Sequence, residues 1–273
     1  MPPNQFTYNG TFTFTYDMIA LLSPAKTLDE TPVHGIQYTL PRLLPKSGQL
    51  IGALRKKSVG DLQELMHISE KLAVQNKERY RHYSEPFTPE NAKPAALLFK
   101  GDVYTGLEAE TFSQEEMTFA QAHIRILSGL YGLLRPLDLI HPYRLEMGTA
   151  LSWRSHKNLY SFWGTTITQL LNDDLAAHPS PTVVNLASQE YFQAIQPHQL
   201  KARLLHIHFK EERGGVLKVI SFNAKKARGK MAQLIVREQL EKPEDLQQLV
   251  VDDYVFRPNL SDESNWIFVK EAL

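Results

Sequence analysis

The sequence predicts a mixed α/β fold, a single compact domain around a central mixed sheet. Its 273 residues are 42% hydrophobic and 10% aromatic, which is enough to bury a sizeable core in one large domain. Short apolar runs typical of buried strands alternate with longer segments whose apolar residues recur at helical spacing. Residues 18–273 contain no internal repeat, low-complexity tract or linker, so these elements belong to one domain.

The first 17 residues differ in pattern from everything that follows. They alternate Thr with aromatic residues and have no helical period. Met18 then opens a short apolar run that ends at Ser23 and Pro24, as expected for a buried strand that enters a loop. We therefore predict that residues 1–17 are an N-terminal extension outside the native domain and that Met18 is a candidate natural start.

Elements of the first half follow from periodicity and capping residues. Apolar residues at helical spacing predict helices within residues 47–83, with Ser58 and Ser69 as N-caps. The run 95–99 reads as a second buried strand that ends in a polar loop. A capping box at 113–116 opens the next helix.

The second half continues the alternation of strand, loop and helix. A glycine pair flanked by two apolar alternating runs predicts a β-hairpin, because glycine adopts the positive φ angles of tight turns. The expected elements, in order, are a Gly-bounded turn at 128–132, a helix at 159–175, a strand at 182–186, hairpin strands at 204–209 and 216–222 around Gly214 and Gly215, a long helix after them, and late strands near Phe256 and 266–269.

Composition excludes several classes of function. Lys+Arg and Asp+Glu number 30 each, so the chain is neither a disordered polyelectrolyte nor globally basic. It has no cysteine, which excludes disulfides, cysteine-ligated metal centres and a thiol nucleophile. Every apolar run is shorter than the roughly 18 residues of a spanning helix, and the start lacks a basic, then apolar leader. We expect a cytoplasmic protein.

The neutral total hides a local asymmetry. Residues 201–230 carry nine Lys/Arg against two Glu, a net charge of +7, and residues 231–273 carry a net charge of −5. Such asymmetry favours a localised anion-binding face, although a solvated hairpin and helix would give the same count.

A basic run opens the predicted long helix. Because successive residues step by about 100°, Lys226 and Lys230 share one helix face and Lys225 and Arg228 another. Positive charge near a helix N-terminus opposes the helix dipole, which is easier to understand if an anion binds there. A plain solvated helix face is the competing interpretation.

The turn Gly129–Gly132 has the Gly-x-x-Gly form of a helix-hairpin-helix, with Leu130 and Tyr131 between its glycines, one residue more than is usual. Exposed backbone N–H groups in such a turn bind a phosphate without reading a base. We expect Gly132 to need a positive φ angle or a close approach to phosphate. The alternative is an ordinary turn in which Tyr131 packs inward.

Five polar clusters stand where apolar runs end, which is where α/β folds usually place ligand sites. Each cluster singly is also explained by turn and cap chemistry. They occupy 23–27, 100–104, 129–138, 185–190 and 225–229.

Metal and nucleophile motifs are weaker. Ser23-x-x-Lys26 lacks the partner motifs of penicillin-recognising enzymes, and Glu64-x-x-His67 lacks the second copy that a di-iron bundle needs. His206 and His208 share a strand face without a third ligand in view. We predict no metal site and no cofactor.

Seven segments of the chain, from residue 18 almost to the C-terminus, closely resemble the YaaA family of bacterial peroxide-stress proteins. They are Leu22–Asp29, Phe99–Leu107, Leu127–Asp138, Pro142–Gly148, Phe162–Gly164, Asn185–Ser188 and Ser221–Gly229. The family lacks an equivalent of residues 1–17.

This resemblance implies a cytosolic protein of the hydrogen peroxide response that limits unincorporated iron. It also implies a compact α/β fold with a positively charged cleft, a helix-hairpin-helix and binding to double-stranded DNA, largely independent of sequence. Carried over residue by residue, the DNA-binding candidates are Lys26, Lys100, Gly129, Leu130, Tyr131, Gly132, Arg135, Arg144, Lys225, Lys226, Arg228 and Lys230.

A second function class stays open beside the DNA-binding module, which we favour. An enzyme acting on a nucleobase or nucleotide, by glycosidic-bond or lyase chemistry, is the alternative, because the sequence holds more acid–base groups than phosphate binding alone requires. The candidates for such catalysis are Lys100, Asp102, Tyr104, Asp138 and Glu190.

Overall fold

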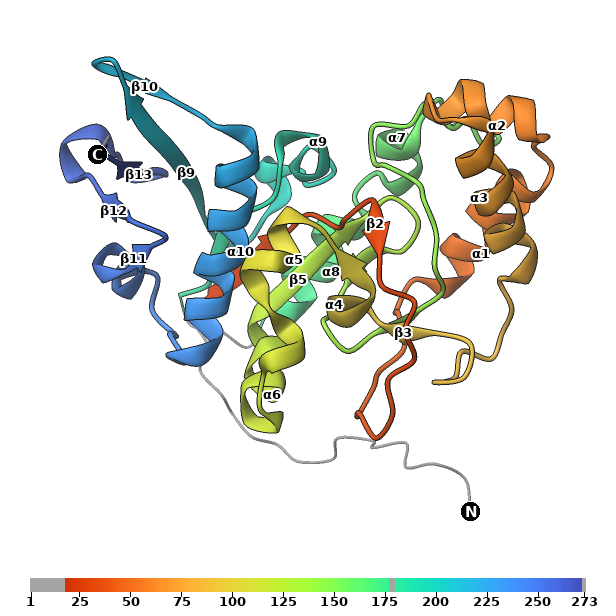
Figure 1. Cartoon of the computed structure of the whole chain (residues 1–273), viewed down its shortest axis with the longest axis horizontal. Helices are drawn as coiled ribbons and strands as arrows, with labels where there is room; N and C mark the ends of the chain where they lie inside the picture. The colour runs from red at the N-terminus through yellow and green to blue at the C-terminus, as the bar shows by residue number, and fades with distance from the viewer. Residues whose placement is uncertain (1–17, 177–179, 272–273) are drawn as a thin grey trace.

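A computed structural model describes residues 18–176 and 180–271. Its centre is a nine-stranded mixed sheet (Figure 1). Eight strands follow the order β11-β12-β13-β9-β8-β1-β5-β6, and the ninth, β10, pairs with β9. The strands of this sheet are β1 (Met18–Leu22), β5 (Ile124–Ser128), β6 (Gly132–Leu134), β8 (Thr182–Asn185), β9 (Arg203–Arg213), β10 (Val216–Lys218), β11 (Val250–Val251), β12 (Tyr254–Phe256) and β13 (Asn265–Lys270). The predicted mixed α/β fold with a central mixed sheet is confirmed.

The middle of the sheet is parallel and its margins are antiparallel. Strand β1 pairs in parallel with β5 on one side and with β8 on the other, and β9 pairs in parallel with both β8 and β13. All five residues of β1 are buried, as expected for a parallel strand covered on both faces, which is why its sequence is a continuous apolar run. Two pairs of short strands lie outside this sheet: β2 (Thr27–Leu28) with β4 (Phe99–Lys100), and β3 (Lys93–Pro94) with β7 (Leu139–Ile140).

Helices cover both faces of the sheet, and a further group of helices lies to one side of it. In Figure 1, α5, α6 and α10 lie in front of the strands, α8 lies behind them, and α1, α2 and α3 form a separate group at the right. The helices are α1 (Leu44–Arg55), α2 (Val59–Met66), α3 (Glu70–His82), α4 (Ala95–Leu98), α5 (Asp102–Leu107), α6 (Gln114–His123), α7 (Leu159–Trp163), α8 (Thr166–Leu175), α9 (Gln189–Phe192) and α10 (Ser221–Arg237). Short 3₁₀ turns occupy Ala109–Thr111, Pro197–Gln199, Pro243–Gln248 and Pro258–Leu260.

Local capping signals proved reliable. The Ser58 and Ser113 hydroxyls accept hydrogen bonds from the third residue of their helices, and each forms a complete capping box. The Ser69 hydroxyl caps α3 by accepting from the Leu72 N–H, without a capping box. Gly214 and Gly215 both have positive φ angles and join β9 to β10, so the predicted hairpin is also confirmed.

Three expected elements differ in the structure. The run 95–99 is not one strand: Ala95–Leu98 is a single helical turn, and only Phe99 enters a strand. The helix expected at 159–175 divides at Gly164, which has a φ angle of 52°. Helix α10 begins at Ser221, within the segment expected as a strand, so Lys225 lies inside the helix rather than at its first residue.

The helix-hairpin-helix expected at Gly129–Gly132 is not formed by this segment. It is the turn between the antiparallel strands β5 and β6, so strands rather than helices flank it. Leu130 and Tyr131 are fully buried, and the Tyr131 N–H donates to Ser128 Oγ at 2.9 Å. The physical reason is the apolar character of Leu130 and Tyr131, which draws the turn into the core. The expected positive φ of Gly132 is confirmed at 74°.

Candidate functional site

The carboxyl ends of β1 and β8 meet at a point where the connections of the sheet diverge. From β1 the chain returns to the sheet in β5 on one side, whereas from β8 it continues to β9 on the other side. Such a switch point opens a crevice above the strand ends and is the usual ligand site of open α/β sheets. Two serines fill its floor: the Ser188 N–H donates to Ser23 Oγ at 2.9 Å, and the hydroxyls lie 3.3 Å apart.

A cavity of about 360 Å³ opens directly beside this serine pair. Four of the five polar clusters of the sequence contribute to its wall, and only the cluster at 129–138 does not. The lining residues are Ser23–Thr27, Lys100–Val103, Glu146, Leu186, Ser188, Glu190, Tyr191, Lys225 and Arg228.

Close packing of α5 against α10 holds the two helices that border the cavity. A β-carbon at Gly106 would lie 2.2 Å from the Lys226 carbonyl oxygen, and one at Gly229 would lie 1.7 Å from the Val103 carbonyl oxygen. Only glycine permits two backbones to approach so closely. The glycine within the basic run therefore serves helix packing, and it fixes Lys225 and Arg228 beside the first turn of α5.

Cations around the cavity outnumber the carboxylates that pair with them. Glu146 Oε1 lies 3.3 Å from Lys26 Nζ and 2.9 Å from Arg144 Nη2. Asp29 is likewise shared by two lysines, with Lys100 Nζ at 3.3 Å and Lys93 Nζ at 3.5 Å. Because each carboxylate can neutralise only one of its two cations, the surroundings of the cavity keep a positive surplus.

Asp29 remains ionised in this arrangement. The pKa of Asp29 is held well below its ordinary range, first by the Thr31 backbone N–H, which donates at 3.0 Å, then by the Thr31 hydroxyl, and further by Lys100 and Lys93. Two lysine charges therefore act on a carboxylate that stays negative at neutral pH.

Arg228 differs from the other cations of the wall. Within the described part of the chain its guanidinium makes no hydrogen bond or ion pair, and Nε is buried without a partner. Burial lowers the pKa of Arg228 from its ordinary value. Lys225 reaches Asp102 only at 3.8 Å, so the α10 side of the cavity is weakly neutralised.

Three of the five catalytic candidates lie on the cavity wall: Lys100, Asp102 and Glu190. Glu190 accepts a hydrogen bond from the Gly148 N–H at 2.9 Å. Tyr104 is buried instead, and its hydroxyl donates to the Ser23 carbonyl at 3.1 Å. Burial raises the pKa of Tyr104 well above its ordinary value, which makes it a poor proton donor.

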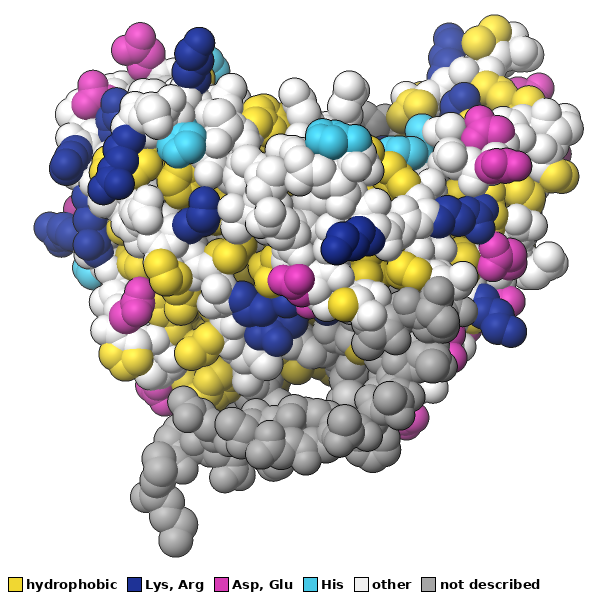
Figure 2. All heavy atoms as spheres, turned by 180° about the vertical axis from the view of Figure 1, so that it is seen from behind, with side chains coloured by type: hydrophobic (Ala, Val, Ile, Leu, Met, Phe, Trp, Pro, Cys, Tyr) yellow, Lys and Arg dark blue, Asp and Glu magenta, His cyan; other side chains and the backbone are white. Residues whose placement is uncertain are grey.

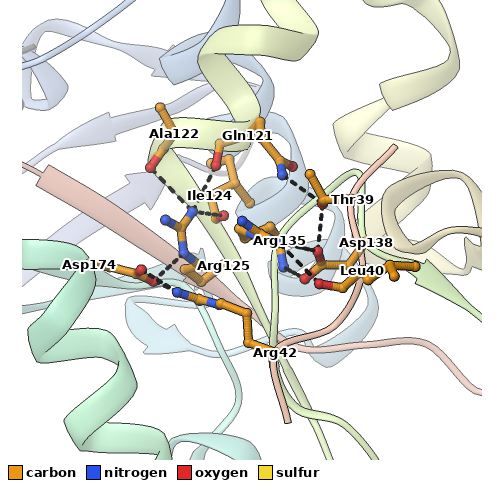
Figure 3. Close-up of polar contacts among 10 residues, drawn as sticks. All are labelled: Thr39, Leu40, Arg42, Gln121, Ala122, Ile124, Arg125, Arg135, Asp138 and Asp174. Carbon is orange, nitrogen blue, oxygen red and sulfur yellow. Dashed lines mark hydrogen bonds and ion pairs between the residues drawn. The ribbon is translucent and has the colours of Figure 1, made fainter. Parts of the chain in front are cut away.

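Asp138, the fifth candidate, belongs to a structural network away from the cavity (Figure 3). It is fully buried, accepts from Thr39 Oγ1 at 2.6 Å and pairs with Arg135 at 2.8 Å. Beside it, Asp174 joins Arg42 and Arg125 in a second buried set of ion pairs. Arg135 and Asp138 thus tie the loop before α1 to the β6–β7 connection.

The remaining DNA-binding candidates are dispersed. Lys226 pairs with Asp252 at 3.4 Å, and Lys230 donates to Gln233 at 2.6 Å, both away from the cavity wall. On the face seen from behind, Lys and Arg side chains stand in separate groups between acidic and apolar ones (Figure 2). Two site residues were missed from the sequence, Glu146 and Asp29. Both stand within segments of family resemblance, which was the one available signal.

Between 18 and 176 and between 180 and 271, no three His, Asp or Glu side chains gather into a metal-binding group. His206 and His208 contact Asn185 and Asn265 respectively. No helix in the described ranges has the length and apolar character needed to cross a bilayer.

The fold and site define an α/β protein with a cation-rich cavity at the switch point in the parallel middle of a mixed sheet. Comparison with known proteins gives its family. The family described as "Peroxide stress protein YaaA" matches residues 18–260, and the chain belongs to that family. A UPF0246 protein of Acaryochloris marina is 49% identical over 253 residues, covering 93% of this chain and all of the relative. A UPF0246 protein of Cupriavidus pinatubonensis is 49% identical over 255 residues, covering 92% and 98% of the two chains.

Proposed function

We propose that this protein acts in the cytoplasmic response to peroxide stress by binding double-stranded DNA, largely without sequence preference. The observation that supports this proposal is the convergence of Lys26, Lys100 and Lys225 around one cavity. Their side chains are 67%, 65% and 51% exposed. Exposed lysines attract phosphates as mobile point charges, which gives affinity without base readout.

Two features make this lysine rim (Lys26, Lys100 and Lys225) suitable for phosphates. It draws on three distant chain segments, so its spacing is fixed by the fold. Glu146 and Asp29 each retain a second cation, so Lys26 and Lys100 can turn to a phosphate without leaving their carboxylates unpaired, and Lys225 reaches its partner Asp102 only at 3.8 Å. The change of partner therefore costs little.

The wider role follows the family description and the resemblance of the sequence. The protein would help to limit free intracellular iron and peroxide damage, with DNA as its direct partner. Its test is a host strain that lacks its own family member. Rim variants should protect that strain from hydrogen peroxide less well than the wild type.

The direct experiment measures duplex affinity against salt. Each phosphate contact contributes a slope of about −0.9 in log affinity against log salt, because bound cations release counterions. The triple variant Lys26→Gln, Lys100→Gln, Lys225→Gln should bind every duplex more weakly and flatten the slope by about two to three units. The control replaces Lys71, Lys201 and Lys242, all exposed and remote from the cavity, by Gln. Equal salt slopes for the two triple variants would refute the role of the lysine rim in DNA binding.

A second candidate, an enzyme acting on a nucleobase or nucleotide, is favoured by one specific observation. Asp102, Glu190, Lys100 and the serine pair all line the one cavity, and these residue types are able to move protons. Turnover of a damaged duplex or a free nucleoside that is lost in Asp102→Asn, with duplex affinity unchanged, would establish this function. Salt-dependent binding of the duplex with no reaction product would support the DNA-binding function instead.

A further inference from the structure

We infer that the cavity is a binding site for the phosphate group of a small molecule, a mononucleotide in size, and that Arg228 is its counter-ion. This site shares its cavity with the lysine rim, but its ligand is a small molecule rather than the duplex of the proposed function. It would accept a discrete ligand whether or not the rim holds a duplex.

The argument starts from the cost of Arg228. Arg228 is half-buried, and a guanidinium N–H removed from water without an acceptor is costly, because buried polar groups are normally hydrogen-bonded. Arg228 nevertheless lines the cavity with its Nε buried and with no partner in the described residues. The neighbouring cations all have carboxylates: Lys26 has Glu146, and Lys225 has Asp102. The missing partner of Arg228 is best supplied by an anion that enters the cavity.

The cavity also offers neutral donors beside this charge. Ser23 Oγ accepts the Ser188 N–H and donates to Ser188 Oγ, which leaves the Ser188 hydroxyl hydrogen free to donate. A guanidinium and a hydroxyl match the several acceptor oxygens of a phosphate. A carboxylate ligand would use fewer of these donors.

The volume of the cavity and its other lining residues define the rest of the ligand. About 360 Å³ lies at the lower end of the range of small-molecule pockets and suits a single nucleotide. Leu186, Val103 and Tyr191 supply apolar and aromatic surface, while Glu190 offers an acceptor. A ring with N–H donors, attached to a phosphate, fits this division of the walls.

The test uses the full chain and titration calorimetry. The probes are deoxyadenosine 5′-monophosphate, deoxyadenosine and inorganic phosphate. The variants are Arg228→Met, which keeps the aliphatic stem, and Arg228→Lys, which keeps the charge. The matched control is Arg237→Met, on the same helix but outside the cavity, where the guanidinium donates to Thr111 at 2.8 Å.

The wild type should bind the monophosphate at least about tenfold more tightly than the nucleoside, because the charge-assisted contact is lost without phosphate. Arg228→Met should abolish this preference, Arg228→Lys should keep part of it, and Arg237→Met should keep all of it. Without ligand, Arg228→Met should melt at or above the wild-type temperature, since an uncompensated charge has been removed.

Equal binding of nucleotide and nucleoside, or unchanged nucleotide binding by Arg228→Met, would overturn the proposal. If Arg228→Met does not fold, the test uses Arg228→Lys. The proposal is then overturned if Arg228→Lys binds the nucleotide as tightly as the wild type and neither protein prefers the monophosphate over the nucleoside. The loss that each variant shows separates this site from the rim: Arg228→Met should lose the preference for the monophosphate over the nucleoside, whereas the rim variant, which keeps Arg228, should lose duplex affinity. Displacement of the monophosphate by duplex would identify the DNA backbone as the source of the phosphate, and its absence a free nucleotide.

Discussion

Gly229 in α10 lies against the carbonyl oxygen of Val103 in α5, so closely that a β-carbon at Gly229 would stand 1.7 Å from that oxygen. The two residues are 126 positions apart by their numbers. Their contact, together with that of Gly106, sets the distance between the two helices that border the cavity. No rotation of a side chain could relieve the overlap, because the neighbouring atom belongs to the backbone.

Gly229→Ala should therefore destabilise the protein, although alanine favours helices. The overlap forces the helices apart, which costs about 1–3 kcal/mol or more in the free energy of unfolding. Urea denaturation followed by circular dichroism measures the change. Gly52→Ala is the matched control: Gly52 lies within α1 and a β-carbon there meets nothing within 4 Å, so this variant should gain about 0.5–1 kcal/mol. A stabilised Gly229→Ala would contradict the helix contact.

Gly132→Ala should lower the stability of the fold itself, not only a surface turn. Its φ angle is 74°, and an added β-carbon would lie 2.9 Å from both Leu43 Cδ1 and Trp163 Cζ3. Strain and overlap together should cost about 2 kcal/mol or more. In Gly214→Ala the φ angle is 61° but nothing lies within 4 Å, so strain alone should cost about 1 kcal/mol. Equal losses for the two variants in thermal unfolding would show that the Trp163 contact does not matter.

Asp174→Asn should destabilise the protein in a pH-dependent way. Burial alone raises the pKa of Asp174, but the hydrogen bonds and charges of Arg42 and Arg125 outweigh it and hold the pKa below its ordinary value. The carboxylate thus contributes stability that is fully present above its unfolded pKa of about 3.9 and is lost as pH falls through the lower folded pKa. Near neutral pH the variant should lose about 3 kcal/mol, because the buried guanidinium of Arg125 and the part-buried one of Arg42 lose their counter-charge.

The difference between Asp174→Asn and the wild type should shrink as acid protonates Asp174 in the folded wild type. Urea midpoints between neutral pH and about pH 3 would follow it. Asp173→Asn, its exposed neighbour in α8, is the control and should unfold like the wild type at every pH. A gap between Asp174→Asn and the wild type that does not depend on pH would argue against the charge and for a packing effect.

Removal of residues 1–17, which lie outside the described residues, should leave the melting temperature within about 3 °C, the shift that about 1 kcal/mol produces in a domain of this size. The family match begins at residue 18, and β1 already pairs on both sides. Removal of residues 1–22, which takes β1 as well, should abolish folding. A shorter deletion that unfolds the protein in calorimetry would mean that the extension belongs to the domain.

Local signals predicted much of this fold. The buried strand at Met18, the caps at Ser58 and Ser113 and the Gly214–Gly215 hairpin all depend on residues within a few positions of each other. The run 95–99 was misjudged because a short buried apolar segment has the same pattern in a helical turn as in a strand.

Burial and pairing over long distances were beyond the sequence. The Gly129–Gly132 turn looks like a phosphate-binding hairpin until the core that covers Tyr131 is known. The clusters at 23–27 and 185–190 do lie at the ends of β1 and β8, whereas the cluster at 225–229 lies inside α10. Nothing in their spacing shows that Lys26 pairs with Glu146 or that Arg135 pairs with Asp138. Arg228 looked like one member of a basic run, and only the fold separates it from its paired neighbours.

The bond between Ser23 and Ser188 also bears on how the protein is made. Its two residues are separated by 165 positions, and the last wall of the cavity, Arg228, follows 40 residues later by the numbering. During synthesis Ser23 therefore stays solvated, without Ser188 as its partner, until most of the polypeptide has left the ribosome. Contacts of such long sequence separation form slowly. The cavity is therefore incomplete in the nascent chain until α10 emerges. A prematurely terminated product that ends before α10 would contain Ser23 and Ser188 but lack Lys225 and Arg228.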